Sequence, residues 1–377
     1  MTNNVNLLFY YPSNKRSIQI ETLLEALKEE GFQVYFLCMG EAGAINYSLD
    51  QLGIKTYSAR VHKKNALQYY LSQILFLIKF VRSHKIEIVL SNLQQANLVS
   101  ILAQYFFKAR LICFRHHFKF FTANNRKNFR VNKNEKIGDI LINRLAKEIV
   151  VPSNGVYQGM VNQEKVNPNK IRIIPYMYRF DHYGKPNDDH VNQIKKSFPF
   201  KLRMIMVSRL IPLKRHMIVL SMIKDLIDQG LNICLFILDE GPEKENIASY
   251  IRKNQLEKNV IMLGFRKDFL NYMAASDLII HPSITEASNS AVKEMALLSK
   301  PSIVCKNVGD FDDYIKHESN GFLCDIDNFA SEAKSLIIKY YYRENALRKI
   351  GTNARKTVLN NFSVNEKNKK KYLDLLS

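Results

Sequence analysis

The feature that most constrains the fold of this chain is a repeated alternation of short apolar runs with segments of helical periodicity. Residues 5–10 form an apolar run typical of a strand, and residues 18–29 then carry their apolar side chains on one face of a helix. Similar apolar runs recur at residues 32–39, 86–90 and 111–114. Strands that alternate with helices predict an α/β fold, in which a parallel sheet is covered by helices on both faces.

The same alternation restarts near residue 202, which indicates a second unit of the same class. Strands are predicted at residues 202–207, 232–238, 260–263, 278–281 and 302–305, and helices at residues 218–229, 243–254 and 290–298. A chain of 377 residues suits two domains, at roughly 150 residues for each. We therefore predict two doubly wound, Rossmann-like domains in tandem.

The predicted domain bounds are residues 1–185 for the first domain and residues 186–361 for the second. Residues 183–200 are polar, contain two prolines and lack an apolar period, so they are predicted as the linker. The last residues, about 362–377, are predicted to form a helix that packs back on the first domain. Ser363 and Glu366 have the spacing of a capping box, which would begin that helix.

Composition places the chain among globular proteins of the cytoplasm. Hydrophobic residues make up 46% of the sequence, which is enough to form real cores. The most apolar stretch, residues 69–81, is shorter than the about 20 residues that a bilayer span needs, and we expect no targeting signal at the N-terminus. The five cysteines show no metal-ligand spacing, so we expect buried free thiols in a reducing cytoplasm.

The formal net charge of +20 calls for an anionic partner. Basic residues interleaved with aromatic ones gather in residues 108–136, just after the apolar stretch 69–81. This composition favours the surface of an anionic membrane, although single-stranded nucleic acid would suit it as well. The alternative is a core helix at residues 69–81 followed by a solvated basic loop.

Two cations follow the first strand of the second domain. Arg209 is the second residue after the strand at residues 202–207, and Lys214 stands five residues further on. They are therefore expected at the carboxyl edge of the sheet, where doubly wound folds bind ligands. A guanidinium and an ammonium group aimed at a phosphate would stabilise its negative charge. An ordinary solvated basic loop is the alternative.

Two carboxylates flank the start of a predicted helix further along. Pro282 closes the strand at residues 278–281, Glu286 lies in the loop that follows, and Glu294 lies one to two turns inside the helix. Ser288 or Asn289 can cap this helix, and the exposed backbone N–H groups of residues 289–291 would suit an anion. Carboxylates in these places can reach two different parts of one extended ligand.

The order of these features resembles family 4 of the retaining glycosyltransferases, from about residue 202 to residue 327. The resemblance implies the GT-B architecture, two Rossmann-like domains facing a central cleft, with a nucleotide-sugar bound on the second domain. It places Arg209 and Lys214 at the diphosphate, Glu286 at the hydroxyls of the donor sugar, and Glu294 at the ribose. The remaining donor-site residues that it implies are Gly264, Phe265, Ser288, Asn289 and Ser290.

The first domain resembles the family less closely. Family members carry a histidine after a strand in this domain, near the donor sugar, and His116 is the candidate, with His117 as the alternative. The catalytic set implied is therefore Glu286, His116, Arg209 and Lys214. The family's glycine-rich loop after the first strand is replaced by residues 12–17, where Lys15 or Arg16 would supply charge. The family's glycines are also replaced, by Asp239, Ser299 and Asp310.

The resemblance implies retaining transfer of a hexose or N-acetylhexosamine from a nucleotide-diphosphate sugar, by default a UDP-sugar. The expected acceptor is a hydroxyl of a growing, lipid-linked bacterial surface glycan, at the inner face of the cytoplasmic membrane, and no nucleic acid is expected. No cofactor or metal is expected either, because Asp325 and Asp327 stand in a predicted solvated loop. The alternatives are a nucleotide-sugar epimerase and a non-catalytic GT-B subunit or polyanion-binding protein.

Overall fold

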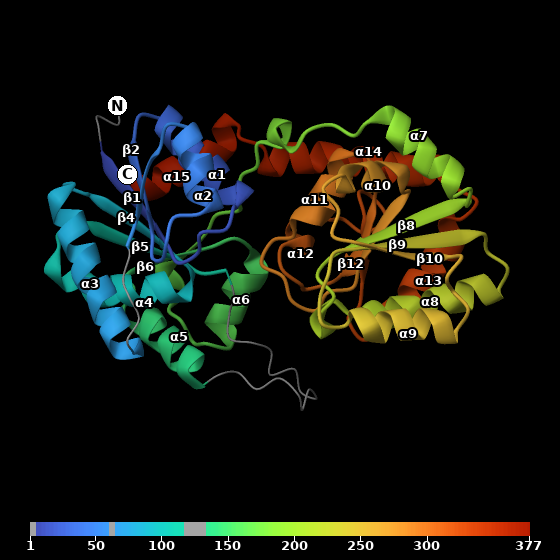
Figure 1. The fold of residues 1–377 in the computed structure, drawn as a ribbon, viewed down its shortest axis with the longest axis horizontal. Coiled ribbons are helices and arrows are strands. Elements are labelled where there is room, and N and C mark those ends of the chain that lie inside the picture. Colours follow the sequence, from blue (N-terminus) through green and yellow to red (C-terminus); the bar gives the residue numbers. More distant parts are fainter. Residues whose placement is uncertain (1–4, 60–64, 117–132) are drawn as a thin grey trace. The chain divides into compact units, whose positions relative to one another are not determined.

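The computed structural model describes residues 5–59, 65–116 and 133–377, and it divides into two compact units. Unit 1 comprises Met1–Arg179 with Val364–Ser377, and unit 2 comprises Phe180–Ser363. In each unit a parallel sheet lies between helices (Figure 1). The chain thus passes from unit 1 to unit 2 within a few residues of the sequence-based bound at 185, and it returns close to residue 362.

The sheet of unit 1 has seven strands in its described part, in the order β3-β2-β1-β4-β5-β6-β7. The strands are β1 (Asn6–Tyr11), β2 (Gln33–Cys38), β3 (Lys55–Ser58), β4 (Ile88–Asn92), β5 (Arg110–Phe114), β6 (Glu148–Val151) and β7 (Ile171–Ile173). The helices are α1 (Ile18–Glu29), α2 (Ala44–Gln51), α3 (Ala66–Ser83), α4 (Leu93–Ala103), α5 (Lys133–Leu145), α6 (Asn154–Asn162) and α15 (Glu366–Leu376), with short 3-10 turns η1 (Gln104–Phe106) and η2 (Pro168–Lys170).

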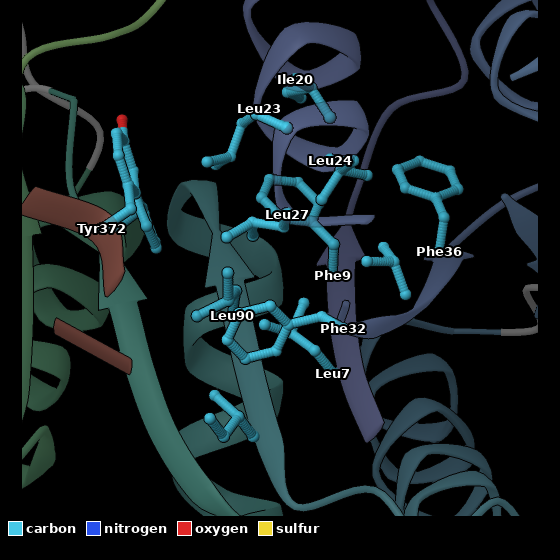
Figure 2. Close-up of a cluster of buried hydrophobic side chains, with 14 of the residues drawn as sticks. Leu7, Phe9, Ile20, Leu23, Leu24, Leu27, Phe32, Phe36, Leu90 and Tyr372 are labelled. Atoms are coloured by element: carbon cyan, nitrogen blue, oxygen red, sulfur yellow. The ribbon is translucent and has the colours of Figure 1, made fainter. Parts of the chain in front are cut away.

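Strand β1 shows why an unbroken apolar run forms a central strand. Leu7 and Phe9 point into a core shared with α1, α2 and α15, whereas Leu8 and Tyr10 point into the core beneath α3 and α4. Successive side chains of a strand face opposite sides, so a strand covered on both faces must be apolar throughout. Figure 2 shows the first of these cores, where α1 packs on β1 and Tyr372 enters from α15.

The C-terminal helix α15 belongs to unit 1. Tyr372 is buried there, and its hydroxyl donates to the carbonyl of Pro175 at 3.1 Å. The predicted capping box at Ser363 is wrong, because Asn365 caps the helix by accepting from the backbone N–H of Asn368 at 3.0 Å. Ser363 instead closes the preceding helix, and its hydroxyl donates to the carbonyl of Leu359.

Unit 2 has a six-stranded parallel sheet in the order β10-β9-β8-β11-β12-β13. Its strands are β8 (Leu202–Val207), β9 (Ile233–Leu238), β10 (Val260–Gly264), β11 (Leu278–His281), β12 (Ser302–Cys305) and β13 (Phe322–Cys324). Its helices are α7 (Asp188–Ser197), α8 (His216–Asp228), α9 (Lys244–Lys253), α10 (Phe269–Ala275), α11 (Ser290–Leu297), α12 (Phe311–Tyr314), α13 (Phe329–Tyr340) and α14 (Glu344–Phe362), with 3-10 turns η3 (Phe180–Tyr183) and η4 (Pro212–Lys214). Strands β8, β11 and β12 coincide with their predicted bounds.

The predicted linker at residues 183–200 is wrong for most of its length, because it contains helix α7. Asn187 begins this helix by accepting from the backbone N–H of His190 at 2.9 Å. Val191 and Ile194 are buried in the core that α7 shares with α10. The buried face of this helix has only two apolar residues, three positions apart, which is too few to give a helical period in a polar segment.

Helix α3 contains the apolar stretch 69–81 and only partly fits the description of a core helix. Leu77 is fully buried, whereas the side chains of Leu71 and Leu75 are exposed. No helix within the described ranges is long and apolar enough to cross a membrane. All five cysteines are buried free thiols, as predicted. The centre of the basic segment 108–136 lies outside the described residues.

Candidate active site

The loops that carry the predicted donor-site residues meet at one edge of the unit 2 sheet. Strands β8 and β11 pair in parallel at the centre of that sheet, so their carboxyl ends lie side by side. Arg209 and Lys214 follow β8, and Glu286 follows β11. This edge, between two central strands, is where doubly wound sheets bind their ligands.

Lys214 and Glu286 form an ion pair across these two loops. The ammonium group of Lys214 donates to Oε1 of Glu286 and to the hydroxyl of Ser283 at 3.3 Å. Arg215 has a left-handed backbone, with φ of 51°, and its guanidinium donates to the carbonyl of Pro282 at 2.8 Å. These hydrogen bonds connect the turn η4 to the loop after β11 and so fix the position of Lys214.

His281 is a site residue that the sequence did not reveal. Its side chain is only 1% exposed, and its Nε2 lies 2.6 Å from Oε1 of Glu286 and 3.0 Å from the side-chain amide of Asn289. Burial raises the pKa of Glu286, but His281 and Lys214 outweigh this effect and lower the pKa to about 2. Glu286 is therefore a carboxylate at neutral pH, with acceptor oxygens for a ligand's hydroxyl groups. A histidine at the end of a strand, five residues before a candidate glutamate, is the signal that could have identified it.

Helix α11 brings the second carboxylate to the site. Asn289 caps this helix, because its side chain accepts from the backbone N–H of Val292 at 2.9 Å. Glu294 lies just over one turn inside and is buried. Burial raises the pKa of Glu294 to about 7, although a hydrogen bond from Ser290 and the charge of Lys293 act against it. This carboxyl group therefore titrates near neutral pH.

A buried polar cluster supports the start of α11. Lys293 pairs with Asp310 at 2.7 Å, and both side chains are almost fully buried. Ser288 belongs to this cluster and is not the helix cap, since its hydroxyl donates to Asp310 at 2.6 Å. Lys293 also donates to the hydroxyl of Ser288 at 2.9 Å and to the carbonyl of Asn289 at 3.2 Å. In the sequence, Asp310 stands out only as a position where the family has glycine. No local pattern indicates Lys293 as its partner.

Gly309 explains how this cluster and Glu286 can pack together. Its φ is +59°, and an added Cβ would lie 2.7 Å from the Cβ of Glu286. A side chain here would therefore displace Glu286 as well as strain the backbone. The loop after β12 thus packs directly against the Cβ and backbone of Glu286, in the loop after β11.

Arg209 is exposed at the same edge and forms no ion pair within the described part of the chain. The next residue, Leu210, is fixed, because its backbone N–H donates to the carbonyl of Glu240 at 3.1 Å. Gly264 ends β10 with a φ of +65°, and Phe265 after it is 72% exposed. The predicted donor-site residues therefore all lie on loops or a helix start at the carboxyl edge of this sheet.

Two replaced glycines keep the backbone that glycine favours. Asp239 has a φ of 92° and Ser299 a φ of 57°. Both lie in the left-handed region, which costs energy for residues other than glycine. Asp239 compensates in part, because its side chain accepts from the backbone N–H of Glu240 at 2.8 Å.

In unit 1, His116 follows β5 at the carboxyl edge of the sheet. Its Nε2 lies 2.8 Å from Oδ1 of Asn92, at the end of β4, and its Nδ1 hydrogen-bonds with the hydroxyl of Tyr176. His117, the alternative candidate, lies outside the described residues. The sequence did not indicate Asn92 or Tyr176, because they are 24 and 60 residues away from His116.

The loop that replaces the glycine-rich segment of unit 1 holds one of its cations in an ion pair. Arg16 pairs with Glu21 of α1 at 3.0 Å, and this bond raises the pKa of Arg16. Lys15 is exposed, and its backbone N–H donates to the hydroxyl of Ser13 at 3.2 Å. Of the two predicted sources of charge, Arg16 is therefore already engaged by a carboxylate.

No group of three or more His, Cys, Asp or Glu side chains in residues 5–59, 65–116 and 133–377 is placed to hold a metal ion. Asp325 instead shapes its own turn, since its side chain accepts from the backbone N–H of Asp327 at 2.9 Å. Its backbone N–H in turn donates to Glu332 at 2.9 Å. Asp325 therefore stabilises the turn that it begins.

Comparison with known proteins agrees with this arrangement. The family described as Glycosyltransferase Family 4 matches residues 17–177, and the family described as Glycosyl transferases group 1 matches residues 190–357. One relative is the UDP-Gal:alpha-D-GlcNAc-diphosphoundecaprenol alpha-1,3-galactosyltransferase of Escherichia coli, 22% identical over 93% of this chain and 92% of its own. A second is an N-acetylgalactosaminyltransferase of Campylobacter jejuni, named for a diphospho-undecaprenol substrate, which is 22% identical over 90% of this chain and 89% of its own.

Solved structures show the same fold. HepE from Anabaena, in complex with UDP and glucose, superposes with a TM-score of 0.80 at 19% identity over 98% of each chain. A glycosyltransferase from Rickettsia africae superposes with a TM-score of 0.79 at 20% identity over 99% of this chain and 98% of its own. Both sheets of this protein therefore have counterparts in GT-B glycosyltransferases. The chain belongs to the family 4 type of glycosyltransferases with the GT-B fold.

Proposed function

We propose that this glycosyltransferase transfers a hexose or N-acetylhexosamine from a UDP-sugar, with retention of configuration. The observation that carries the proposal is the contact of Lys214, Glu286 and His281 at the carboxyl edge of the unit 2 sheet, beside the exposed Arg209. The name of the Escherichia coli relative specifies UDP-Gal as donor, and HepE binds UDP and glucose. These relatives support a uridine nucleotide.

In this proposal Arg209 and Lys214 bind the diphosphate of the donor. Negative charge grows on that group as it leaves, and preorganised cations stabilise such charge. Lys214 exchanges Glu286 for a phosphate partner when the donor arrives, and the carboxylate of Glu286 then accepts from the sugar's hydroxyl groups. The ion pair of the free protein thus holds both groups ready for their ligand.

Glu294 and the start of α11 bind the rest of the nucleotide. A carboxylate accepts from the two ribose hydroxyls, and the N–H groups of residues 289–291, at the start of the helix, suit a phosphate oxygen. Gly264 and Phe265 line the base. In unit 1, His116 is the residue proposed to bind the donor sugar. None of these steps uses a metal ion.

The proposed acceptor is a lipid-linked glycan, since both relatives described above are named for undecaprenol-linked substrates. An apolar face in unit 1 fits the surface of the membrane that would hold such an acceptor. Leu67, Leu71 and Leu75 of α3 are 70%, 51% and 67% exposed, and their spacing of four places them on one face of the helix. These residues are termed the α3 stripe.

Basic residues accompany the α3 stripe on the same unit. A hollow of about 720 Å³ beyond the end of α3 is lined by Arg82, Lys85 and Lys108, together with the exposed rings of Tyr105 and Phe106. Exposed leucines and aromatic rings beside basic residues suit the surface of an anionic bilayer. We therefore propose peripheral binding to the inner face of the cytoplasmic membrane.

Vesicle flotation tests this membrane contact. Replacing Leu71 and Leu75 by Ser should weaken binding to phosphatidylglycerol-containing vesicles by about tenfold for each leucine. The folded state should be little affected, because both side chains are exposed. Ile338→Ser on α13 of unit 2, where the side chain is 44% exposed, is the matched control and should leave flotation unchanged. Equal flotation of all variants would contradict the proposal.

The transfer itself is tested by release of nucleotide. A thermal-shift panel of UDP-, GDP- and dTDP-sugars first identifies the donor, and release of its nucleotide is then measured with lipid-diphosphate-linked glycans. Release should depend on the acceptor and should fall steeply in Glu286→Gln. Full activity of that variant would refute the site assignment. Conversion of the donor without acceptor would indicate an epimerase, and no response to any nucleotide-sugar would indicate a non-catalytic subunit.

A further inference from the structure

A recess lies at the opposite edge of the unit 2 sheet from the candidate active site. It has a volume of about 200 Å³, and its lining includes Leu202, Asp277 and Pro301, which stand at the amino-terminal ends of β8, β11 and β12. Arg209 and Glu286 follow the carboxyl ends of β8 and β11, so the recess is a separate place in the fold. Its volume is well above what one water molecule needs.

The recess is strongly basic. Five cations from different segments of unit 2 line it, and they are Lys195, Lys201, Arg203, Lys300 and Arg348. The carboxylates in its lining are Asp277 and Glu344. Asp277 is already bound by Arg203 at 3.1 Å. Within the described residues, Lys195, Lys300 and Arg348 form no ion pair, so positive charge is left in excess.

Close packing of two elements forces some of these cations together. Gly351 of α14 lies so near the loop after α11 that an added Cβ would be 2.0 Å from the carbonyl oxygen of Ser299. Arg348 is three residues before Gly351 on the same helix face, and Lys300 directly follows Ser299. Contacts between the two backbones therefore hold these cations near each other. A change in side-chain rotamer cannot remove those backbone contacts.

The pKa of Lys300 is consistent with several positive charges lying close together. Burial lowers its pKa, Asp277 acts against this, and the positive charges of Lys195 and Arg348 lower the pKa further. Lys201 is also constrained, since its ammonium group lies 4.0 Å from the ring centroid of Tyr342. A group of neighbouring cations that repel one another is stabilised when an anion enters, even though Lys201 and Arg348 are exposed.

We propose that this recess binds a small phosphorylated anion of the pyrophosphate class. Such an anion carries several negative charges in a compact form, and its oxygens can accept from ammonium and guanidinium groups on different sides at once. Lys300 and Arg348 are its central ligands, and Lys195 and Lys201 complete the charge balance. The proposal does not rest on the function of the site at the other edge of the sheet.

Calorimetric titration with inorganic pyrophosphate at 0.15 M salt tests this site. The double variant Lys300→Met/Arg348→Met keeps the apolar volume and removes the two central charges. It should bind pyrophosphate about a hundredfold more weakly, since each charged hydrogen bond contributes about tenfold in affinity. Its Tm without ligand should not fall, because two repelling charges are removed. Lys253→Met/Lys258→Met, with the same charge change on exposed lysines of unit 2, should bind as the wild type does.

Three results would overturn the proposal. The first is wild-type affinity in the recess variant, and the second is an equal loss in the control variant, which would show an effect of net charge alone. The third is loss of binding in Arg209→Ala but not in the recess variant, which would place the anion at the donor edge. Affinity for the nucleotide-sugar should be unchanged in the recess variant, so failure of the two proposals can be told apart.

Discussion

The carboxyl edges of the two sheets use their charged side chains differently. In unit 2, Lys214 and Glu286 are bound to each other on two facing loops, next to Arg209, which is exposed. In unit 1, Arg115 is buried beside Asp139 at 3.3 Å and Glu164 at 3.4 Å, and so it connects the end of β5 to helix α5 and to the turn after α6. Unit 2 therefore holds its ion pair on two loops at this edge, where the donor is proposed to bind, whereas the buried ion pairs of unit 1 connect parts of its own fold.

The largest expected effect compares the buried cations of the two units. Lys293→Met should lower the free energy of unfolding by about 3–5 kcal/mol, because Asp310 would stay almost fully buried with only the neutral hydroxyl of Ser288 as donor among the described residues. Arg115→Met should lower it less, since Asp139 is 20% exposed and keeps a donor in Gln94, and Glu164 keeps one in Asn143. Urea unfolding measures both changes.

The double variant Lys293→Met/Asp310→Asn is the control for this comparison. It removes both charges of the pair, so it should recover most of the stability that Lys293→Met loses. A double variant no more stable than the single one would show that the packing of Lys293 against Phe362 matters more than its charge, since the ammonium group lies 4.5 Å from that ring centroid.

The next comparison concerns catalysis. Lys214→Met should lower kcat by about 10²–10³, the usual loss when one preorganised donor to a developing charge is removed. His116→Ala should have a smaller effect, because His116 is proposed to contact the sugar and not the leaving group. Nucleotide release at saturating donor measures both, with Lys224→Met on the exposed face of α8 as control. A larger loss for His116→Ala would reverse the assignment of roles to the two units.

These contrasts also explain which parts of the molecule the sequence could predict. The strands of unit 2 are unbroken apolar runs between turns, so β8, β11 and β12 were found with their bounds. Arg209, Lys214, Glu286 and Glu294 are placed by short segments that directly follow those strands. The pairing of Lys214 with Glu286, 72 residues away, depends on which strands become neighbours, and no local pattern records that.

The same reasoning accounts for what was missed in unit 1. Strand β3 has no fully buried residue, and β7 has only three residues, so neither stands out as an apolar run. The hydrogen-bond partners of His116 come from the carboxyl end of β4 and from the segment after β7. These two segments meet only in the folded sheet. Helix α7 gives no helical period in the sequence because its buried stripe is only Val191 and Ile194.

The buried carboxyl group of Glu294 should lower the stability of the folded protein at neutral pH. Its pKa is raised from 4.5 to about 7, so between these pH values the folded protein keeps a proton that the unfolded chain releases. The free energy of unfolding should therefore fall as pH rises from 4.5 to 7, by about 3 kcal/mol from this group. Glu294→Gln should lack this contribution.

The comparison with Glu294→Gln also removes the effect of His216. Burial lowers the pKa of that histidine to about 4, so its contribution to stability rises with pH between 4 and 6.5 and opposes that of Glu294. The difference between wild type and variant, from urea unfolding at each pH, isolates the glutamate. A difference that does not change with pH would contradict a raised pKa.

A smaller effect is expected from the polar contacts of unit 1. Tyr176→Phe removes one hydrogen bond to His116, which corresponds to about 1 kcal/mol, or about a fivefold loss in kcat/KM. It should also move the pH profile of kcat/KM, because the hydroxyl group of Tyr176 contacts Nδ1 of the imidazole. An unshifted profile with the same loss would indicate a purely structural role for Tyr176.

The smallest effect tests the replaced glycines of unit 2. Ser299→Gly should stabilise the protein by about 0.5–1 kcal/mol, because relief of a left-handed backbone exceeds the added freedom of the unfolded chain. Asp239→Gly should gain less, since aspartate tolerates this backbone better and its bond to the N–H of Glu240 would be lost. Thermal unfolding ranks the two variants. If Asp239→Gly proved the more stabilising, the backbone strain would be greater beside Arg209, at the edge where the donor is proposed to bind. The candidate site of unit 2 would then contain backbone strain as well as charge.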